Sequence, residues 1–237
     1  MSCKKKNDIF KIEYYNRSID TYLVMHVVPV EWGSEHELEK VMLITQDIGQ
    51  KHELENLANT DGLTGLYNER YFNSILHKKE LQKLPFILFY LDLDHFKPVN
   101  DTYGHDMGDK LLKEAATRLQ SCIRSNDYAF RIGGDEFSLV VCTEFDESLC
   151  CRIKEQIQNR LCAPFDIDGK TLYVGSSCGY AAYPNDASTA NEIRILADQR
   201  MYAEKEKHHM FSSLSSSSTG SGLEKIISLD HIYTPVA

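Results

Sequence analysis

The sequence predicts an α+β fold, because hairpin-linked strands and amphipathic helices are intermixed along it. Two strand-like runs, 128–132 and 137–142, flank Gly133 and Gly134, and a Gly-Gly pair between two such runs is a hairpin signal. Apolar residues over 108–123 recur at helical spacing and predict a helix with one buried face.

The first 60 residues predict two strands and a helix. Residues 20–32 alternate in polarity, 39–48 form a second strand-like run, and 33–36 between them are turn-forming. Residues 49–59 are helical in pattern, with Leu54 and Leu57 on a polar background. The remaining expected elements are, in chain order, helix 68–81, strand 86–93, helix 108–123, hairpin 128–142, helix 146–161, strand region 171–183 and helix 190–207.

The composition of the chain argues against several classes of function. The 237 residues suffice for one full domain and part of a second, and the net charge of -9 argues against a nucleic-acid polymer as partner. No apolar run reaches the length of a membrane span, so we expect no membrane contact within this chain. The 7 cysteines form no CxxC pair, which indicates reduced thiols and a cytoplasmic protein. His208 and His209 are interpreted as a solvated helix end rather than a metal site.

Acidic side chains stand at two predicted strand ends. The apolar run 85–93 ends around Asp92, and Asp135 and Glu136 follow the glycines of the hairpin. A carboxylate in an apolar strand is costly unless it is paired or binds a cation. We therefore expect Asp92 and Asp135 to converge on Mg²⁺, which takes oxygen ligands and shares them with substrate phosphates. The alternatives are a hairpin with solvated acids and, for Asp92, a helix N-cap or a salt-bridged acid.

These motifs belong to an ordered series that resembles the GGDEF domain of the diguanylate cyclase family. The resemblance covers about residues 57–210 and is specific because five segments occur in the right order and spacing. It implies an antiparallel central sheet wrapped by helices, of the nucleotidyl-cyclase palm or ferredoxin-like type. The five segments are 61–70, 92–109, 133–137, 177–181 and 197–202.

A weaker resemblance concerns the segment before this domain. Two or three strands feeding a helix resemble the C-terminal part of a PAS sensor domain and its signalling helix. The expected organisation is a partial PAS-like remnant over 1–48, a signalling-helix linker over 49–60, a GGDEF domain over 61–210 and a flexible Ser-rich tail over 211–237.

The resemblance implies an enzyme that condenses two GTP into cyclic di-GMP and releases two pyrophosphates, working as a homodimer with Mg²⁺ or Mn²⁺. Mapped onto this sequence, Asp92, the Leu93 carbonyl and Asp135 would hold the metal. Glu136 would be a further metal ligand or the group that assists deprotonation of the attacking hydroxyl, and both roles stay open. Asp135, Glu136 and Lys205 are the expected catalytic residues.

Substrate contacts follow from the same resemblance. Backbone N–H groups of His95, Phe96 and Lys97 would bind phosphates, as would the Lys205 side chain, whose alternative role is one charge on a solvated face. The guanine-reading residues would be Asn100 and Asp109, and Asp109 could also be the N-cap of the helix that follows.

Two further positions affect regulation and turnover. The family usually has an arginine where this sequence has His209, which favours weaker triphosphate binding and leaves open a degenerate domain that binds GTP or cyclic di-GMP without turnover. A dimerisation module is a third reading, but it would not explain the five segments. Arg124 and Asp127 match the family's product-inhibition motif, and the alternative is a surface ion pair.

Overall fold

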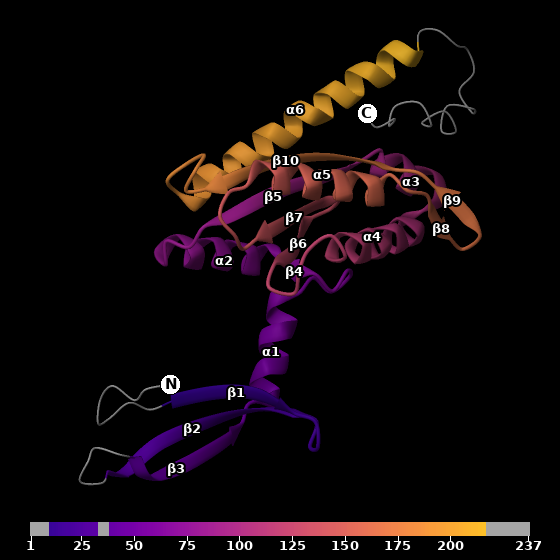
Figure 1. Ribbon diagram of the computed structural model, residues 1–237. Helices are drawn as coiled ribbons and strands as arrows, with labels where there is room; N and C mark the ends of the chain where they lie inside the picture. Colours follow the sequence, from indigo (N-terminus) through magenta and orange to yellow (C-terminus); the bar gives the residue numbers. More distant parts are fainter. Residues whose placement is uncertain (1–9, 33–37, 217–237) are drawn as a thin grey trace. The chain divides into compact units, whose positions relative to one another are not determined.

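The computed structural model describes residues 10–32 and 38–216, and the chain divides into two units, Met1–Asn59 and Thr60–Ala237. The first unit is a three-stranded antiparallel sheet followed by a helix (Figure 1). Strand order is β1-β2-β3. The elements are β1 (Phe10–Asn16), β2 (Thr21–Trp32), β3 (Leu38–Asp47) and α1 (Gly49–Asn59).

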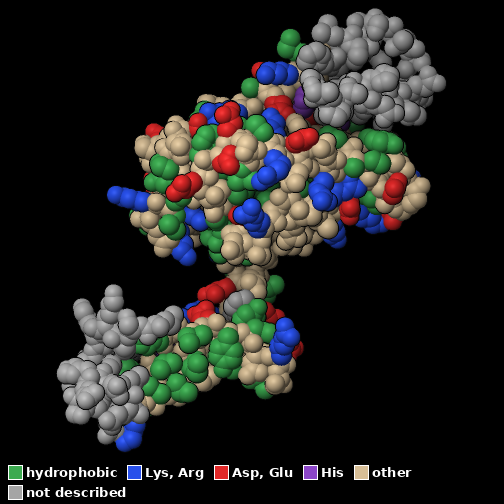
Figure 2. Space-filling model, viewed as in Figure 1, with side chains coloured by type: hydrophobic (Ala, Val, Ile, Leu, Met, Phe, Trp, Pro, Cys, Tyr) green, Lys and Arg blue, Asp and Glu red, His purple; other side chains and the backbone are tan. Residues whose placement is uncertain are grey.

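The sequence predicted β2, β3 and α1 to within one residue at each end, but it did not predict β1. The turn expected at 33–36 lies outside the described residues. Hydrophobic side chains gather on the surface of this sheet (Figure 2), and among them Tyr14, Val41, Leu43 and Ile44 are exposed. Contiguous apolar surface of this kind marks interaction sites in soluble proteins.

The second unit is built on a five-stranded sheet in the order β10-β5-β7-β6-β4. All neighbours are antiparallel except β4 and β6, which are parallel. The strands are β4 (Tyr67–Asn68), β5 (Phe86–Asp94), β6 (Tyr128–Gly133), β7 (Glu136–Val141) and β10 (Gly175–Tyr183), with a separate hairpin of β8 (Phe165–Ile167) and β9 (Lys170–Leu172). The helices are α2 (Glu69–Leu81), α3 (Phe96–Tyr103), α4 (His105–Gln120), α5 (Glu147–Leu161) and α6 (Ala190–Ser216). The predicted α+β class with a largely antiparallel sheet wrapped by helices is confirmed.

Two hydrophobic clusters cover opposite faces of this sheet because successive side chains of a strand point to opposite sides. In β5, Phe89 and Leu91 belong to the cluster formed with α3, α4 and α5, whereas Leu88 and Tyr90 belong to the cluster formed with α2 and α6. Figure 1 shows the sheet enclosed between these helices. Asp92 and Asp94 continue the even-numbered series of β5, so they lie on the α6 face.

Three predicted boundaries are wrong. α4 begins at His105 rather than 108, because Gly104 (φ 86°) ends α3 and at once precedes the next helix. The strand region 171–183 is interrupted and forms two strands, β9 and β10. α6 continues through Ser216, past the expected start of a flexible tail at 211, and residues 217–237 of that tail lie outside the described residues.

Within the described ranges, 10–32 and 38–216, no helix is long and apolar enough to cross a membrane.

Candidate active site

Two of the acids predicted from sequence lie in one row with a serine across three neighbouring strands. Asp92 of β5 lies directly opposite Glu136 of β7 on one side and opposite Ser177 of β10 on the other. Directly opposed residues of a sheet share a face, so all three side chains point toward α6. Asp92 is buried, with 6% of its surface exposed. The strand register therefore brings together two carboxylates that are 44 positions apart in the sequence.

The turn over 133–136, here called the signature turn, is held in place by backbone contacts. Gly133 pairs with Glu136, and Gly134 adopts a φ of +51° that favours glycine. The N–H of Leu93 donates to the carbonyl of Asp135 at 3.2 Å, which ties the turn to the end of β5. Asp135 thus stands beside Leu93, as the predicted metal set requires, and its side chain is half-buried.

Lys205 of α6 lies over the acids. Its Nζ donates to Asp92 Oδ1 at 2.7 Å. Burial raises the pKa of Asp92; Lys205 opposes that shift, while Asp135 and Asp94 add to it. Burial of Lys205 would lower its pKa, but the acids, Asp92 first, raise it overall. In this structure Asp92 is thus salt-bridged, and its partner is the lysine predicted to bind phosphate.

The surroundings of Glu136 raise its pKa and give it a hydrogen-bond donor. Burial raises its pKa, and the nearby charges of Asp92 and Asp198 raise it further. The Tyr90 hydroxyl donates to Glu136 Oε2 at 3.4 Å, and burial raises the pKa of that hydroxyl, so it remains a donor. Tyr90 was not predicted as a site residue, since an aromatic in an apolar strand carries no signal other than core packing.

The donor set fits a hard divalent cation. In the described part of the chain no three His, Cys, Asp or Glu side chains already surround one metal position. Mg²⁺ does not require such a cage, because it is usually bound by one or two carboxylates together with substrate phosphates and water. Burial is the main cause of the raised pKa values of Asp92 and Glu136, and neighbouring carboxylates add to it, so a bound divalent cation would favour the charged forms of both.

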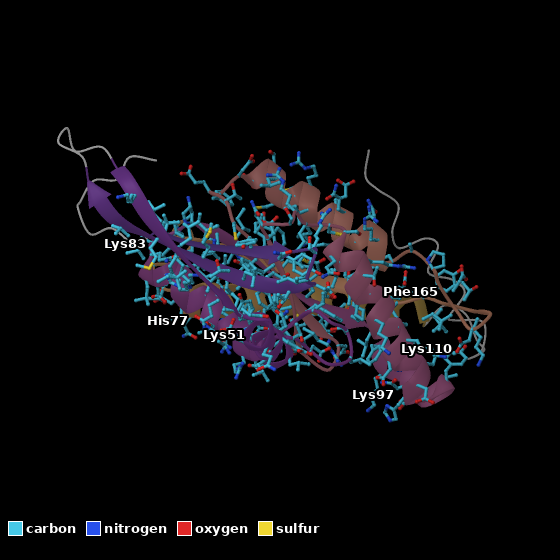
Figure 3. All side chains as sticks on the ribbon, turned by 90° about the horizontal axis from the view of Figure 1, so that it is seen from below. Lys51, His77, Lys83, Lys97, Lys110 and Phe165 are labelled. Carbon is cyan, nitrogen blue, oxygen red and sulfur yellow. The ribbon has the colours of Figure 1, made fainter. Side chains whose placement is uncertain are left out.

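The predicted phosphate-binding stretch is not a loop, because β5 extends to Asp94 and α3 begins at Phe96. His95, the one residue between them, adopts a left-handed conformation (φ 64°) and turns the chain into the helix. Phe96 is buried in the core, whereas Lys97 is exposed (Figure 3). The N-terminus of a helix, with its N–H groups and positive dipole end, is suited to binding phosphate.

The two predicted guanine-reading residues lie at the contact of α3 with α4. Asn100 packs against Gly108, where an added Cβ would stand 1.9 Å from Asn100 Oδ1, and Asp109 follows Gly108 directly. Asp109 is exposed inside α4 and is not an N-cap, since that helix begins at His105. Glycine at 108 therefore leaves the space that the Asn100 amide occupies.

The interpretation of His208 as a solvated helix end is wrong. His208 Nδ1 lies 2.9 Å from Asp94 Oδ2 and 3.2 Å from Ser177 Oγ, and the Ser177 hydroxyl donates to Asp94 Oδ1 at 2.8 Å. Its hydrogen bond with Asp94 raises the pKa of His208 despite burial. Asp94 is 3% exposed, so Ser177 and His208 satisfy a buried carboxylate. The local sequence gave no signal for this contact.

The predicted product-inhibition motif, Arg124 to Asp127, forms a structured turn at the entry to β6. Asp127 accepts hydrogen bonds from the backbone N–H groups of Arg124 (3.0 Å) and Cys142 (2.9 Å). Arg124 is exposed, and in the part of the chain that the structure describes no ion pair joins its guanidinium to Asp127. The surface ion pair considered from sequence is therefore absent.

Comparison with known proteins decides the family. The family described as "Diguanylate cyclase, GGDEF domain" matches residues 58–210. The chain belongs to this family. The match agrees with the segments from which the resemblance was drawn, and it contains every predicted site residue.

Relatives of this GGDEF domain differ in what they are named for. YhcK of Bacillus subtilis, an uncharacterized protein, is 38% identical over 202 residues, which cover 80% of this chain and 54% of YhcK. MucR of Pseudomonas aeruginosa, a bifunctional diguanylate cyclase/cyclic di-GMP phosphodiesterase, is 34% identical over 178 residues, which cover 73% of this chain and 26% of MucR. The chain spans 22% to 54% of the length of the first curated relatives.

A solved structure supports the same assignment. The coiled coil and GGDEF domain of DgcB from Caulobacter crescentus, in complex with c-di-GMP, superposes with a TM-score of 0.60 at 26% identity. The alignment covers 67% of this chain and 86% of that one. The sheet and helices described above are thus those of a GGDEF domain.

Proposed function

We propose that this GGDEF domain is a diguanylate cyclase that condenses two GTP into cyclic di-GMP with release of two pyrophosphates. The observation that carries the proposal is the row that sets Asp92 beside Glu136 under Lys205, with the N-terminus of α3 at the end of the same strand. Phosphoryl transfer needs carboxylates that bind a metal ion and cationic or N–H groups that bind phosphates. This site provides the carboxylates, a lysine and the N–H groups of a helix.

Each step forms one P–O bond and breaks another. The 3'-hydroxyl oxygen of one GTP attacks the α-phosphorus of the other, pyrophosphate leaves, and the hydroxyl proton passes to a base. Glu136, with its raised pKa and its hydrogen bond from Tyr90, accepts that proton or adds to the metal ligands. Asp92, the Leu93 carbonyl and Asp135 would hold Mg²⁺ or Mn²⁺, and the bound ion would neutralise charge on the reacting phosphate.

Substrate recognition is assigned to groups around this centre. The backbone N–H groups of 95–97 and the Lys205 ammonium bind the triphosphate. Asn100 and Asp109 read the guanine edge, because a carboxylate accepts from the N–H groups that guanine has and adenine lacks there. Lys205 would then exchange its contact with Asp92 for phosphate oxygens when metal and GTP arrive.

The active form is a homodimer in which each half-site holds one GTP, since one polypeptide presents a single set of these groups. A cytoplasmic location fits the thiols, because none of the six cysteines that the structure describes forms a disulfide. The residues before the domain serve as a PAS-like sensor remnant with its signalling helix.

The experiment is incubation with GTP and MgCl₂ followed by chromatography of the nucleotides. Wild type should form cyclic di-GMP and pyrophosphate at a rate that rises faster than linearly with protein concentration. Asp135→Asn, which keeps the shape of the side chain but removes its charge, should abolish turnover. Product formation by this variant at the wild-type rate would contradict the assignment.

A second candidate is a domain that binds GTP or cyclic di-GMP without turnover. It is favoured by His209 at the position where the family usually has an arginine. Binding of a non-hydrolysable GTP analogue, measured by calorimetry, together with no cyclic di-GMP in the incubation would support this candidate over the cyclase.

A further inference from the structure

α6 contacts the end of β5 at two acid–base pairs. Lys205 donates to Asp92, and His208 pairs with Asp94, at 2.7 and 2.9 Å respectively. Ser177 of β10 completes the second pair by donating to the remaining oxygen of Asp94 at 2.8 Å. Both carboxylates are buried, so each contact is made away from bulk water, where it is strongest.

The spacing of the two pairs matches the geometry of the two elements. Asp92 and Asp94 are two residues apart on one strand face, roughly 6.6 Å along it. Lys205 and His208 are three residues apart on α6, and side chains so spaced are neighbours on a helix surface, about 5 to 6 Å apart. One contact alone would leave the helix able to pivot about it, whereas two contacts fix both its rotation and its position along β5.

Close packing against β10 holds α6 up to Met201, whereas polar contacts predominate after it. An added Cβ at Gly179 would stand 2.2 Å from the backbone of both Ala197 and Met201, so β10 and α6 are in close contact there. Past Met201 the helix becomes more exposed, with Tyr202 at 59% and Met210 at 65%. In this part, Glu204 binds Lys154 and Gln158 of α5. Lys205 and His208 make the polar contacts with β5.

We propose that His208 is a positioning residue that, through Asp94 and Ser177, sets the register of α6 on β5 and so holds Lys205 in place for the triphosphate. The proposal rests on the proposed function for the role of Lys205. When Asp92 binds a cation, the contact of His208 with Asp94 still holds this part of α6 on β5.

The first test needs no nucleotide. Hydrogen exchange of the amides over 201–210 is compared in wild type, His208→Ala, His208→Asn and the neighbouring exposed control Lys207→Ala. His208→Ala should accelerate exchange about tenfold. His208→Asn should restore most of the protection, because its amide nitrogen can donate to Asp94 from near the Nδ1 position. Equal protection in wild type and His208→Ala would overturn the proposal, as would an equal loss in Lys207→Ala.

The second test separates positioning from general stability. In a double-mutant cycle, His208→Ala should lower kcat/KM for GTP about tenfold in the wild-type background and hardly at all in Lys205→Ala. If His208→Ala lowered kcat/KM by the same factor in the wild-type and Lys205→Ala backgrounds, His208 would not act through Lys205.

The two proposals can fail separately. If the wild type shows no turnover, the cyclase assignment fails, and the cycle is measured instead on the affinity for a non-hydrolysable GTP analogue. If no analogue binds either, the exchange experiment still decides whether His208 sets the position of α6.

Discussion

Arg131 binds Asp61 and the signature turn with one side chain. Its Nη1 lies 3.2 and 3.4 Å from the two carboxylate oxygens of Asp61, while Nε and Nη2 donate to the Gly134 carbonyl at 3.0 and 2.8 Å. Asp61 also accepts from the backbone N–H and the hydroxyl of Thr64. The first turn of the domain and the turn that carries Asp135 are therefore held by a single planar guanidinium.

Replacing Arg131 by lysine should destabilise the domain, because an ammonium cannot satisfy the Gly134 carbonyl and Asp61 with the same fork geometry. The expected loss in the free energy of unfolding is about 1 to 3 kcal/mol, the range for hydrogen bonds to charged groups. Urea denaturation measures it, and Arg152→Lys on the exposed surface of α5 is the control. A loss no larger than the control's would mean that the bridge contributes little.

The same contact predicts a pH dependence. Burial would raise the pKa of Asp61, but hydrogen bonds from Thr64 and Arg131 outweigh it and lower the pKa below its ordinary value of 3.8. A lowered folded-state pKa gives stability that is present above the unfolded value and lost as pH falls through the folded one. Wild type should therefore be more stable than Asp61→Asn at pH 5 and above, and the difference should shrink below pH 4. A constant difference in urea midpoint from pH 3 to 6 would contradict this.

Much of the site was predictable because the individual strands and the hairpin of β6 with β7 follow from local pattern. Alternation along the apolar run before Asp92 and the turn around Gly133 and Gly134 determine which side chains share a face, and a slip of one residue would move every side chain to the other face. The pairing of β5 with β7, which sets Asp92 opposite Glu136, joins strands separated in the chain by α3, α4 and β6. Its register therefore did not follow from the local sequence.

The unpredicted parts depend on how helices dock. His208 lies in a polar stretch that resembles a solvated helix face, and only the position of α6 on β5 brings it to Asp94. The start of α4 was misplaced because Gly104 ends one helix and precedes the next without a loop between them. β1 was missed because its residues are mostly exposed, so its alternation carries little information about burial.

Close helix packing on the sheet can be tested at Gly179. An added methyl group would stand 2.2 Å from backbone atoms of α6, which cannot move aside as a side-chain end can. Gly179→Ala should therefore lower the free energy of unfolding by about 3 kcal/mol. Gly62→Ala is the matched control, because nothing lies within 4 Å of its added Cβ, and its effect should stay within about 0.5 kcal/mol. Similar unfolding curves for the two variants would show that α6 and β10 are not in close contact.

Gly108→Ala should weaken guanine recognition without unfolding the domain. Its methyl group would meet Asn100 Oδ1 at 1.9 Å, and that atom is the end of a side chain that can rotate away. The Asn100 amide would then be displaced from its position against residue 108. We expect KM for GTP to rise about tenfold with little change in thermal stability, as for loss of one hydrogen-bonding group. Unchanged KM in steady-state assays would show that Asn100 does not read the base.

Cyclic di-GMP should bind at Arg124 and inhibit. The two residues of the motif have different roles in the structure. Both carboxylate oxygens of Asp127 accept hydrogen bonds from backbone N–H groups, so Asp127→Ala would disturb the turn itself. Arg124→Ala is the cleaner variant, since alanine keeps the N–H that Asp127 accepts from and removes only an exposed guanidinium. That guanidinium has the planar donor fork that suits a guanine edge or a phosphate.

Arg124→Ala should therefore lose product inhibition and keep catalysis. Calorimetry should show that cyclic di-GMP binds the wild type and Lys113→Ala, an exposed control on α4, with similar affinity. Binding to Arg124→Ala should be at least about tenfold weaker, because hydrogen bonds from arginine to charged or guanine groups contribute about 1.5 to 3 kcal/mol. Inhibition of the wild type should be non-competitive with GTP, since the motif lies at the entry to β6 rather than among the acids on the α6 face. Equal affinity of the product for wild type and Arg124→Ala would show that this arginine serves only as a surface charge.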